Sequence, residues 1–134
     1  IVESQISHKQ AMVVGSHDGF RFEAGSPIHQ RKWLLESKCL KIVDTVLGHR
    51  SFNIDVIFRL HPDISVQQGF ENSIVLTLPC GREVVFEYQT GIDVDVEATT
   101  WHPSFGSVQE SSLIRCTTRG NGTININFNF IWAD

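Results

Sequence analysis

The fold class of this chain follows from the stretch Ile124–Trp132, which reads ININFNFIW. Apolar residues fill almost every second position, and asparagines fill the positions between them. Successive side chains of a β-strand point to opposite faces of its sheet. The stretch therefore predicts a half-buried strand, with Ile124, Ile126, Phe128, Phe130 and Trp132 facing inward and Asn125, Asn127 and Asn129 facing water.

The same alternation recurs upstream, with no convincing helical periodicity. It predicts further strands at residues 12–14, 29–36, 40–47, 52–60, 73–78, 83–88, 92–97 and 113–118. Three short connections between them contain glycine and are typical of hairpins: Gly48–Ser51, Pro79–Gly81 and Gly120–Gly122. The last of these predicts that residues 113–118 pair with the final strand. We expect one all-β domain over residues 1–134, an antiparallel, supersandwich-like β-sandwich of about nine or ten strands without a major helix.

Composition narrows the function classes. The chain has 134 residues, 41% of them apolar, which is enough for one core. Its formal net charge is −4, with acids and bases interspersed, so a nucleic-acid partner is not expected. No run of 18 apolar residues occurs, so no membrane span is predicted. Three widely spaced cysteines, Cys39, Cys80 and Cys116, predict buried thiols, with one disulfide as the alternative.

Five strings, in this order, resemble the β-sandwich region of heparinase II/III-like proteins, a group related to polysaccharide lyases. They are Ser16–Phe20 (SHDGF), Pro27–Lys32 (PIHQRK), Ile42–Val46 with the trailing Gly48, Phe58–Asp63 (FRLHPD) and Trp101–Gly106 (WHPSFG). Together they cover the chain from about Gly15 to its end.

The resemblance implies a larger parent protein, bacterial and periplasmic or envelope-associated, that cleaves uronic-acid-containing glycans by β-elimination. In such proteins an N-terminal α/α-toroid domain supplies the catalytic tyrosine, histidine and amide side chain. Two strings that help to hold a metal lie earlier in the β region of such proteins, and neither string occurs in this chain. This chain, which begins at Ile1, is then expected to be a C-terminal fragment without catalytic residues or cofactor of its own. The implied partners are the toroid domain and an anionic polysaccharide, and a divalent metal is possible in the parent.

The residues themselves agree with a supporting role. β-Elimination needs a group that neutralises the sugar carboxylate, a base and an acid. The single tyrosine, Tyr88, alternates with Val84 and Phe86 and is expected to be structural. No two histidines have the close spacing of a local zinc chelate, so no metal site is predicted.

Candidate contact residues lie in three of the family-like strings. We predict that His17, Asp18, His61, Trp101 and His102 contact the substrate or the toroid domain. Since functional residues cluster at strand ends, His17, His61 and Trp101 are expected at one end of the sandwich, with Trp101 partly exposed. The competing interpretation for Asp18 and Gly19 is a turn in which Asp18 caps amides and Gly19 has a positive φ. A carbohydrate-binding module with Trp101 as its platform, or a protein-interaction module, is the alternative function.

Overall fold

The computed structural model describes residues 1–133, and this part of the chain contains eleven β-strands and no helix. The strands are β1 (Glu3–Ile6), β2 (Ala11–His17), β3 (Ile28–Leu35), β4 (Cys39–Leu47), β5 (Ser51–Arg59), β6 (Ser65–Gln68), β7 (Ser73–Thr77), β8 (Glu83–Tyr88), β9 (Asp93–Trp101), β10 (Gln109–Asn121) and β11 (Ile124–Trp132). All pairings are antiparallel, and the predicted β-sandwich class is confirmed.

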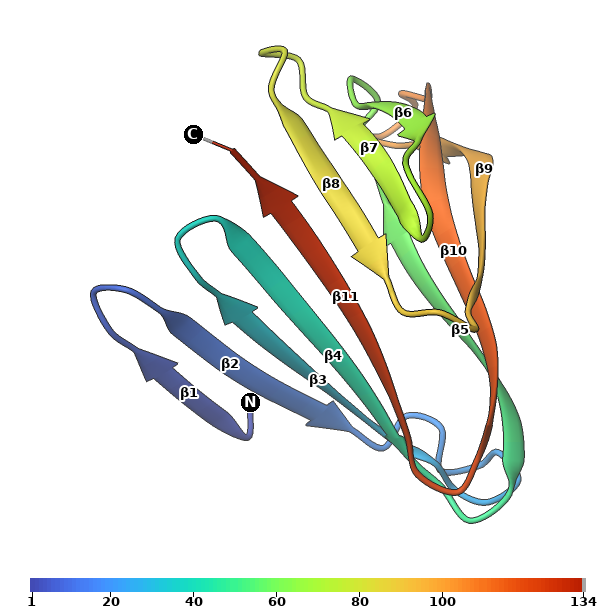
Figure 1. Ribbon diagram of the computed structural model, residues 1–134. Coiled ribbons are helices and arrows are strands. Elements are labelled where there is room, and N and C mark those ends of the chain that lie inside the picture. The colour runs from blue at the N-terminus through green and yellow to red at the C-terminus, as the bar shows by residue number, and fades with distance from the viewer. Residues whose placement is uncertain (134) are drawn as a thin grey trace.

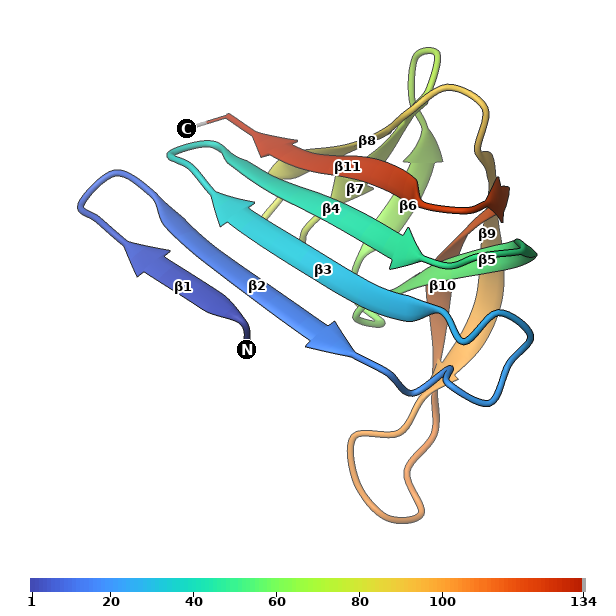
Figure 2. The same ribbon diagram turned by 90° about the horizontal axis from the view of Figure 1, so that it is seen from below.

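The strands form two sheets of unequal size. The large sheet has the order β1-β2-β3-β4-β11-β8-β7-β6, and the small sheet has the order β5-β10-β9. Figures 1 and 2 both show the β1 end of the large sheet extending away from the small sheet. Residues 1–133 include no helix that is long and apolar enough to span a bilayer.

Two of the three predicted hairpins are instead connections between the sheets. Pro79–Gly81 does join the paired strands β7 and β8. By contrast, β4 and β5 lie in different sheets, and β10 pairs with β5 and β9 rather than with β11. Phe52 packs at both crossings, since a Cβ added to Gly48 or Gly120 would come within 2.5 Å or 2.9 Å of its ring. Glycine at these positions therefore leaves room for an aromatic ring where the chain changes sheets.

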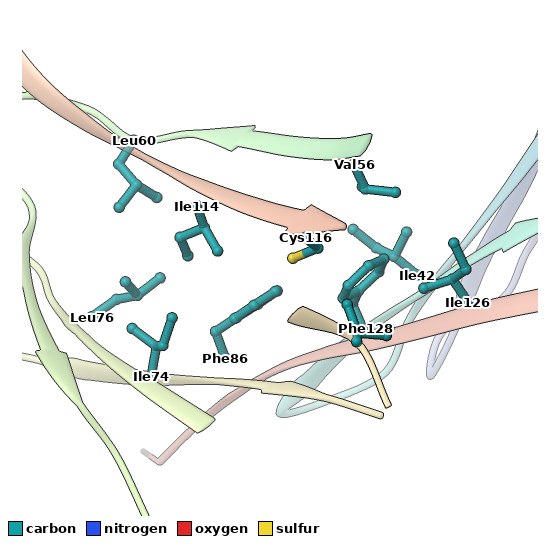
Figure 3. Close-up of a cluster of buried hydrophobic side chains, with 11 residues drawn as sticks. Ile42, Val56, Leu60, Ile74, Leu76, Phe86, Ile114, Cys116, Ile126 and Phe128 are labelled. Carbon is teal, nitrogen blue, oxygen red and sulfur yellow. The ribbon is translucent and has the colours of Figure 1, made fainter. Parts of the chain in front are cut away.

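The core lies between β7, β8, β4 and β11 of the large sheet and β5 and β10 of the small one (Figure 3). Phe86 and Phe128 are at most 1% exposed and stack with a centroid separation of 5.7 Å. Phe58 of β5 reaches across and meets the Phe128 ring edge-on at 5.0 Å. The predicted inward face of β11 is thus confirmed at its centre, where Ile126 and Phe128 are buried while Asn125 and Asn127 are exposed.

Two strands were not predicted, and both are short strands at the edges of the large sheet. β1 is exposed at all four positions, and β6 has one half-buried residue, Val66. Edge strands of this kind bury at most one side chain, so their sequences carry no alternation to detect.

The three cysteines are free thiols, and the prediction that all of them are buried is wrong for two. Cys116 is 1% exposed, Cys39 is half-buried, and Cys80 is exposed in the β7–β8 turn. Burial raises the pKa of the Cys116 thiol to about 12, and the charge of Asp44 adds to this shift.

Cys80 and Cys116 should therefore differ in their rates of alkylation. At pH 8 we expect iodoacetamide to modify Cys80 at least about 100-fold faster than Cys116, because only the thiolate reacts and Cys116 holds its proton. Mass spectrometry of peptides from timed samples measures both rates in one protein. Similar rates in the folded state, with equal rates in urea as the reference, would contradict the burial of Cys116.

Candidate functional site

A buried carboxylate, Asp44, organises the polar residues on the inner face of the large sheet. Asp44 is 0% exposed and lies on β4 between the inward-facing Ile42 and Val46. Arg31, its register partner on β3, donates two hydrogen bonds of 2.7 Å, from Nε to Oδ1 and from Nη2 to Oδ2. His29 Nε2 lies 2.6 Å from the same Oδ1. A buried charge needs such partners, and both oxygens of Asp44 have one.

The electrostatic result is a carboxylate that stays ionised despite its burial. Burial alone would raise the pKa of Asp44, but the hydrogen bonds from His29 and Arg31 and the positive charge of Arg31 outweigh it. The net effect lowers the pKa of Asp44 below its ordinary value of 3.8. Arg31 is itself 24% exposed and lies over the Phe58 ring at 5.6 Å, so the ion pair borders the hydrophobic core.

Hydrogen bonds extend the Asp44 cluster outward to His17 at the end of β2. The backbone N–H of Gly19 donates to His17 Nδ1 at 3.2 Å, so this nitrogen carries no proton. His17 Nε2 then donates to His29 Nδ1 at 3.0 Å, and His29 Nε2 donates to Asp44. One neutral tautomer of each histidine therefore satisfies the whole chain from the loop amide to the buried carboxylate.

A groove of about 680 Å³ lies beside this cluster. Its floor comes from the inner face of β3 and β4, one wall comes from Ser51–Ile57 of β5, and the loop after β2 closes its end. The remaining lining residues are Phe20, Glu23, Ala24, Pro27, His29, Arg31, Asp44 and Val46.

The predicted turn after β2 differs from the observed one. The ring of His17, rather than the carboxylate of Asp18, accepts the Gly19 amide. Asp18 is exposed and makes a loose ion pair with Arg21 at 3.8 Å. Gly19 does not have a positive φ; in this loop the left-handed residues are Gly25 and Ser26, at 90° and 44°. The loop turns later than the sequence suggested.

The other predicted contact residues form a second cluster. The rings of His61 and Trp101 lie 5.7 Å apart, and His61 accepts the amide of Asp63 at 3.3 Å. His102 is exposed, with Nε2 3.0 Å from the hydroxyl of Thr100. Trp101 is half-buried, as expected for a residue that keeps part of its ring accessible.

These two clusters do not share one end of the sandwich, so that prediction is wrong. His17 lies beside the groove wall that starts at Ser51, whereas His61 follows the other end of β5. A nine-residue strand spans roughly 26 Å between its first and last residues, which is the scale of the separation. In Figure 1 the ends of β2 and β9 accordingly lie on opposite sides of the molecule.

The Asp44 cluster is suited to holding structure rather than to moving protons. Both nitrogens of His17 and His29 and both oxygens of Asp44 are already engaged. The guanidinium of Arg31 occupies the place where a cation would sit, so these residues do not fit a metal. Residues 1–133 contain no group of three or more His, Cys, Asp or Glu side chains placed to hold a metal ion.

Sequence comparison decides the family. The model of the heparinase II/III-like C-terminal domain matches residues 2–129. This chain belongs to that family. No curated protein matches its sequence.

Solved structures place the fold of this heparinase II/III-like domain among known lyases. Heparan sulfate lyase HepC from Pedobacter heparinus aligns with a TM-score of 0.85 at 13% identity. A heparinase III, the BT4657 gene product, gives 0.81 at 9%, and a further heparinase III gives 0.79 at 11%. Each alignment covers 98% of this chain but 21% of the other. The heparinase II/III-like domain thus spans about a fifth of the length of these enzymes.

The sequence alone did not identify the central residues of the Asp44 cluster as a group. His29, Arg31 and Asp44 stand out in the sequence only as parts of family-like strings. One signal was available in this heparinase II/III-like sequence: Asp44 alternates with Ile42 and Val46, which places an acid on the core face. Such a position requires a cationic or donor partner nearby.

Proposed function

We propose that this chain is the C-terminal β-sandwich of a polysaccharide lyase that cleaves uronic-acid-containing glycans by β-elimination. The domain would support an α/α-toroid catalytic domain of the same protein and have no activity alone. The observation that carries this proposal is the family match over residues 2–129, together with a fold shared with heparan sulfate lyases that are about five times longer.

The chemistry of the described residues supports the supporting role. Elimination needs a cation for the uronate, and Arg31 already forms a two-point ion pair with Asp44. Tyr88 lies on the core face of β8, with its ring 6.0 Å from Phe86. Within residues 1–133 we therefore find no tyrosine, histidine and arginine converging on one open site.

Absorbance of unsaturated uronate products in the near ultraviolet tests the proposal. The whole protein is expected to release such products from heparan sulfate or a related uronic-acid glycan, whereas the purified 134-residue chain should release none. As a matched control, Tyr88→Phe in the whole protein should leave the rate within about twofold, because this residue is assigned to packing.

Two results would refute this assignment. Product formed by the 134-residue chain would show that it carries its own catalytic groups. Glycan binding by the chain, with no cleavage of any uronic-acid glycan by the whole protein, would favour a carbohydrate-binding module instead.

A further inference from the structure

The small sheet covers only part of the inner face of the large one. The strand register aligns one row of apolar residues across seven strands of the large sheet. The residues of this row are Ile6, Ala11, Leu35, Leu40, Phe130, Phe86 and Ile74. Phe86 and Ile74 are at most 2% exposed, but Leu35 is 45% and Ile6 is 83% exposed. The face is built as one continuous apolar surface, and its end at Leu35 and Ile6 is left exposed.

The small sheet ends where this uncovered surface begins. β5 pairs with β10 on one side only, so its other edge is a row of free backbone groups along nine residues. Phe58 of β5 lies over Phe128 and Phe86, and the guanidinium of Arg31 on β3 contacts the Phe58 ring from one side. The free edge of β5 therefore faces the β3 side of the large sheet.

The groove beside the Asp44 cluster follows this edge. Seven consecutive residues of β5, Ser51–Ile57, form its wall, and the inward residues of β3 and β4 form its floor. A free strand edge beside an exposed sheet face is the arrangement that binds an extended polypeptide by adding a strand. A strand placed there would lie over Arg31, Trp33 and Leu35, which share the inner face of β3.

We propose that the free edge of β5 and the inner face of β1–β3 bind an extended segment from the rest of the same protein, which adds to the small sheet. The inference rests on the proposed function for its premise that the protein is longer. The relatives support this occupant, because this fold makes up 21% of HepC. The exposed apolar residues Leu35 and Ile6, together with free backbone donors and acceptors, suit a β-strand better than a sulfated glycan. A sulfated glycan needs cations, and Arg31 of the groove is already paired with Asp44.

Cysteine labelling of the whole protein tests which face is covered. Leu35→Cys and Ile28→Cys form a matched pair, since both residues lie on β3, are 45% and 41% exposed in this chain, and face opposite sides of the sheet. We expect the cysteine at position 35 to react with a maleimide at least about 10-fold more slowly than the one at position 28, after each rate is normalised to the unfolded protein. Equal rates at the two positions would overturn the proposal.

Two further measurements keep the test decisive. In the unaltered whole protein, amide hydrogen exchange of residues 52–58 should be slow at consecutive positions, because an added strand bonds the outward amides; fast exchange at alternate positions counts against it. A photo-crosslinker on the cysteine at position 35 should capture residues outside 1–134 of the same chain. Capture of a second copy, with protection lost on dilution, would also overturn the proposal.

Lyase activity is assayed on the same preparations, which separates this inference from the proposed function. Protection at position 35 without any lyase activity would retain the docking surface and reject the enzyme assignment. Lyase activity with equal labelling of both faces would retain the enzyme assignment and reject the docking surface.

Discussion

Replacing Asp44 with alanine is expected to lower the free energy of unfolding by about 3–5 kcal/mol, because it leaves the Arg31 guanidinium at the edge of the core without its counter-ion. Arg31 loses two hydrogen bonds and His29 loses one. The side chain of Asp44 is 1% exposed, so water does not already solvate the carboxylate that is removed. Urea denaturation followed by tryptophan fluorescence measures the change.

The matched control is Asp55→Ala on the small sheet. Asp55 also accepts a hydrogen bond from an arginine, Arg115, at 3.0 Å, but its side chain is 48% exposed and Arg115 keeps Glu97 as a second partner. Exposed pairs contribute little, so this change should cost no more than about 1 kcal/mol. Asp44→Asn keeps the shape and removes the charge, and it should be nearly as destabilising as the alanine change. Equal small effects of Asp44→Ala and Asp55→Ala would contradict the role given to the buried pair.

The pH dependence of stability follows from the same carboxylate. Its pKa is lowered in the folded state, so the stabilisation is fully present above the ordinary value of 3.8 and is lost as the pH falls through the folded pKa. Hydrogen bonding from Arg115 likewise lowers the pKa of Glu97. The unaltered protein should therefore lose stability below about pH 4 more steeply than Asp44→Asn does. Parallel curves for the two proteins would show that Asp44 is not the titrating group.

The second large effect is expected in the core, where Phe128→Ala should cost about 3–5 kcal/mol. Phe128 is 1% exposed and packs against Phe58 and Phe86 from the two sheets, so its removal opens a cavity that neither sheet can fill alone. Asn127→Ala, the adjacent outward residue, should cost no more than about 0.5 kcal/mol. Its amide nitrogen bonds Gln89 at 3.0 Å in an exposed position. Denaturant melts in which the two variants have similar midpoints would mean that the register of β11 is wrong.

The sequence by itself determined the all-β class, the positions of nine strands and the inward face of β11. These features depend on residues close together along the chain: alternation reports which side of a strand is dry, and proline or glycine reports where it turns. The five family-like strings also identified the family that the comparisons then showed. Local pattern was sufficient because each of these features is local.

The tertiary structure alone decided the assignment of strands to sheets. Gly48–Ser51 and Gly120–Gly122 have the glycines of hairpins, yet both connections cross between the sheets, because Phe52 packs against Gly48 and Gly120 and β11 finds its partners in β4 and β8. A turn sequence limits the direction of the chain but not the partner that follows it. The pairing is set by burial of the two inner faces, which involves residues far apart in sequence.

The polar cluster was decided in the same way. His17, His29, Arg31 and Asp44 come from three strands, and register places them in adjacent rows on one face. Alternation showed that Asp44 faces the core, but it could not identify Arg31 as the partner of Asp44. It also could not show that His17 and His61 lie at opposite ends of β5. Side-chain partners depend on which strands are neighbours, and that is a property of the whole sandwich rather than of any single segment.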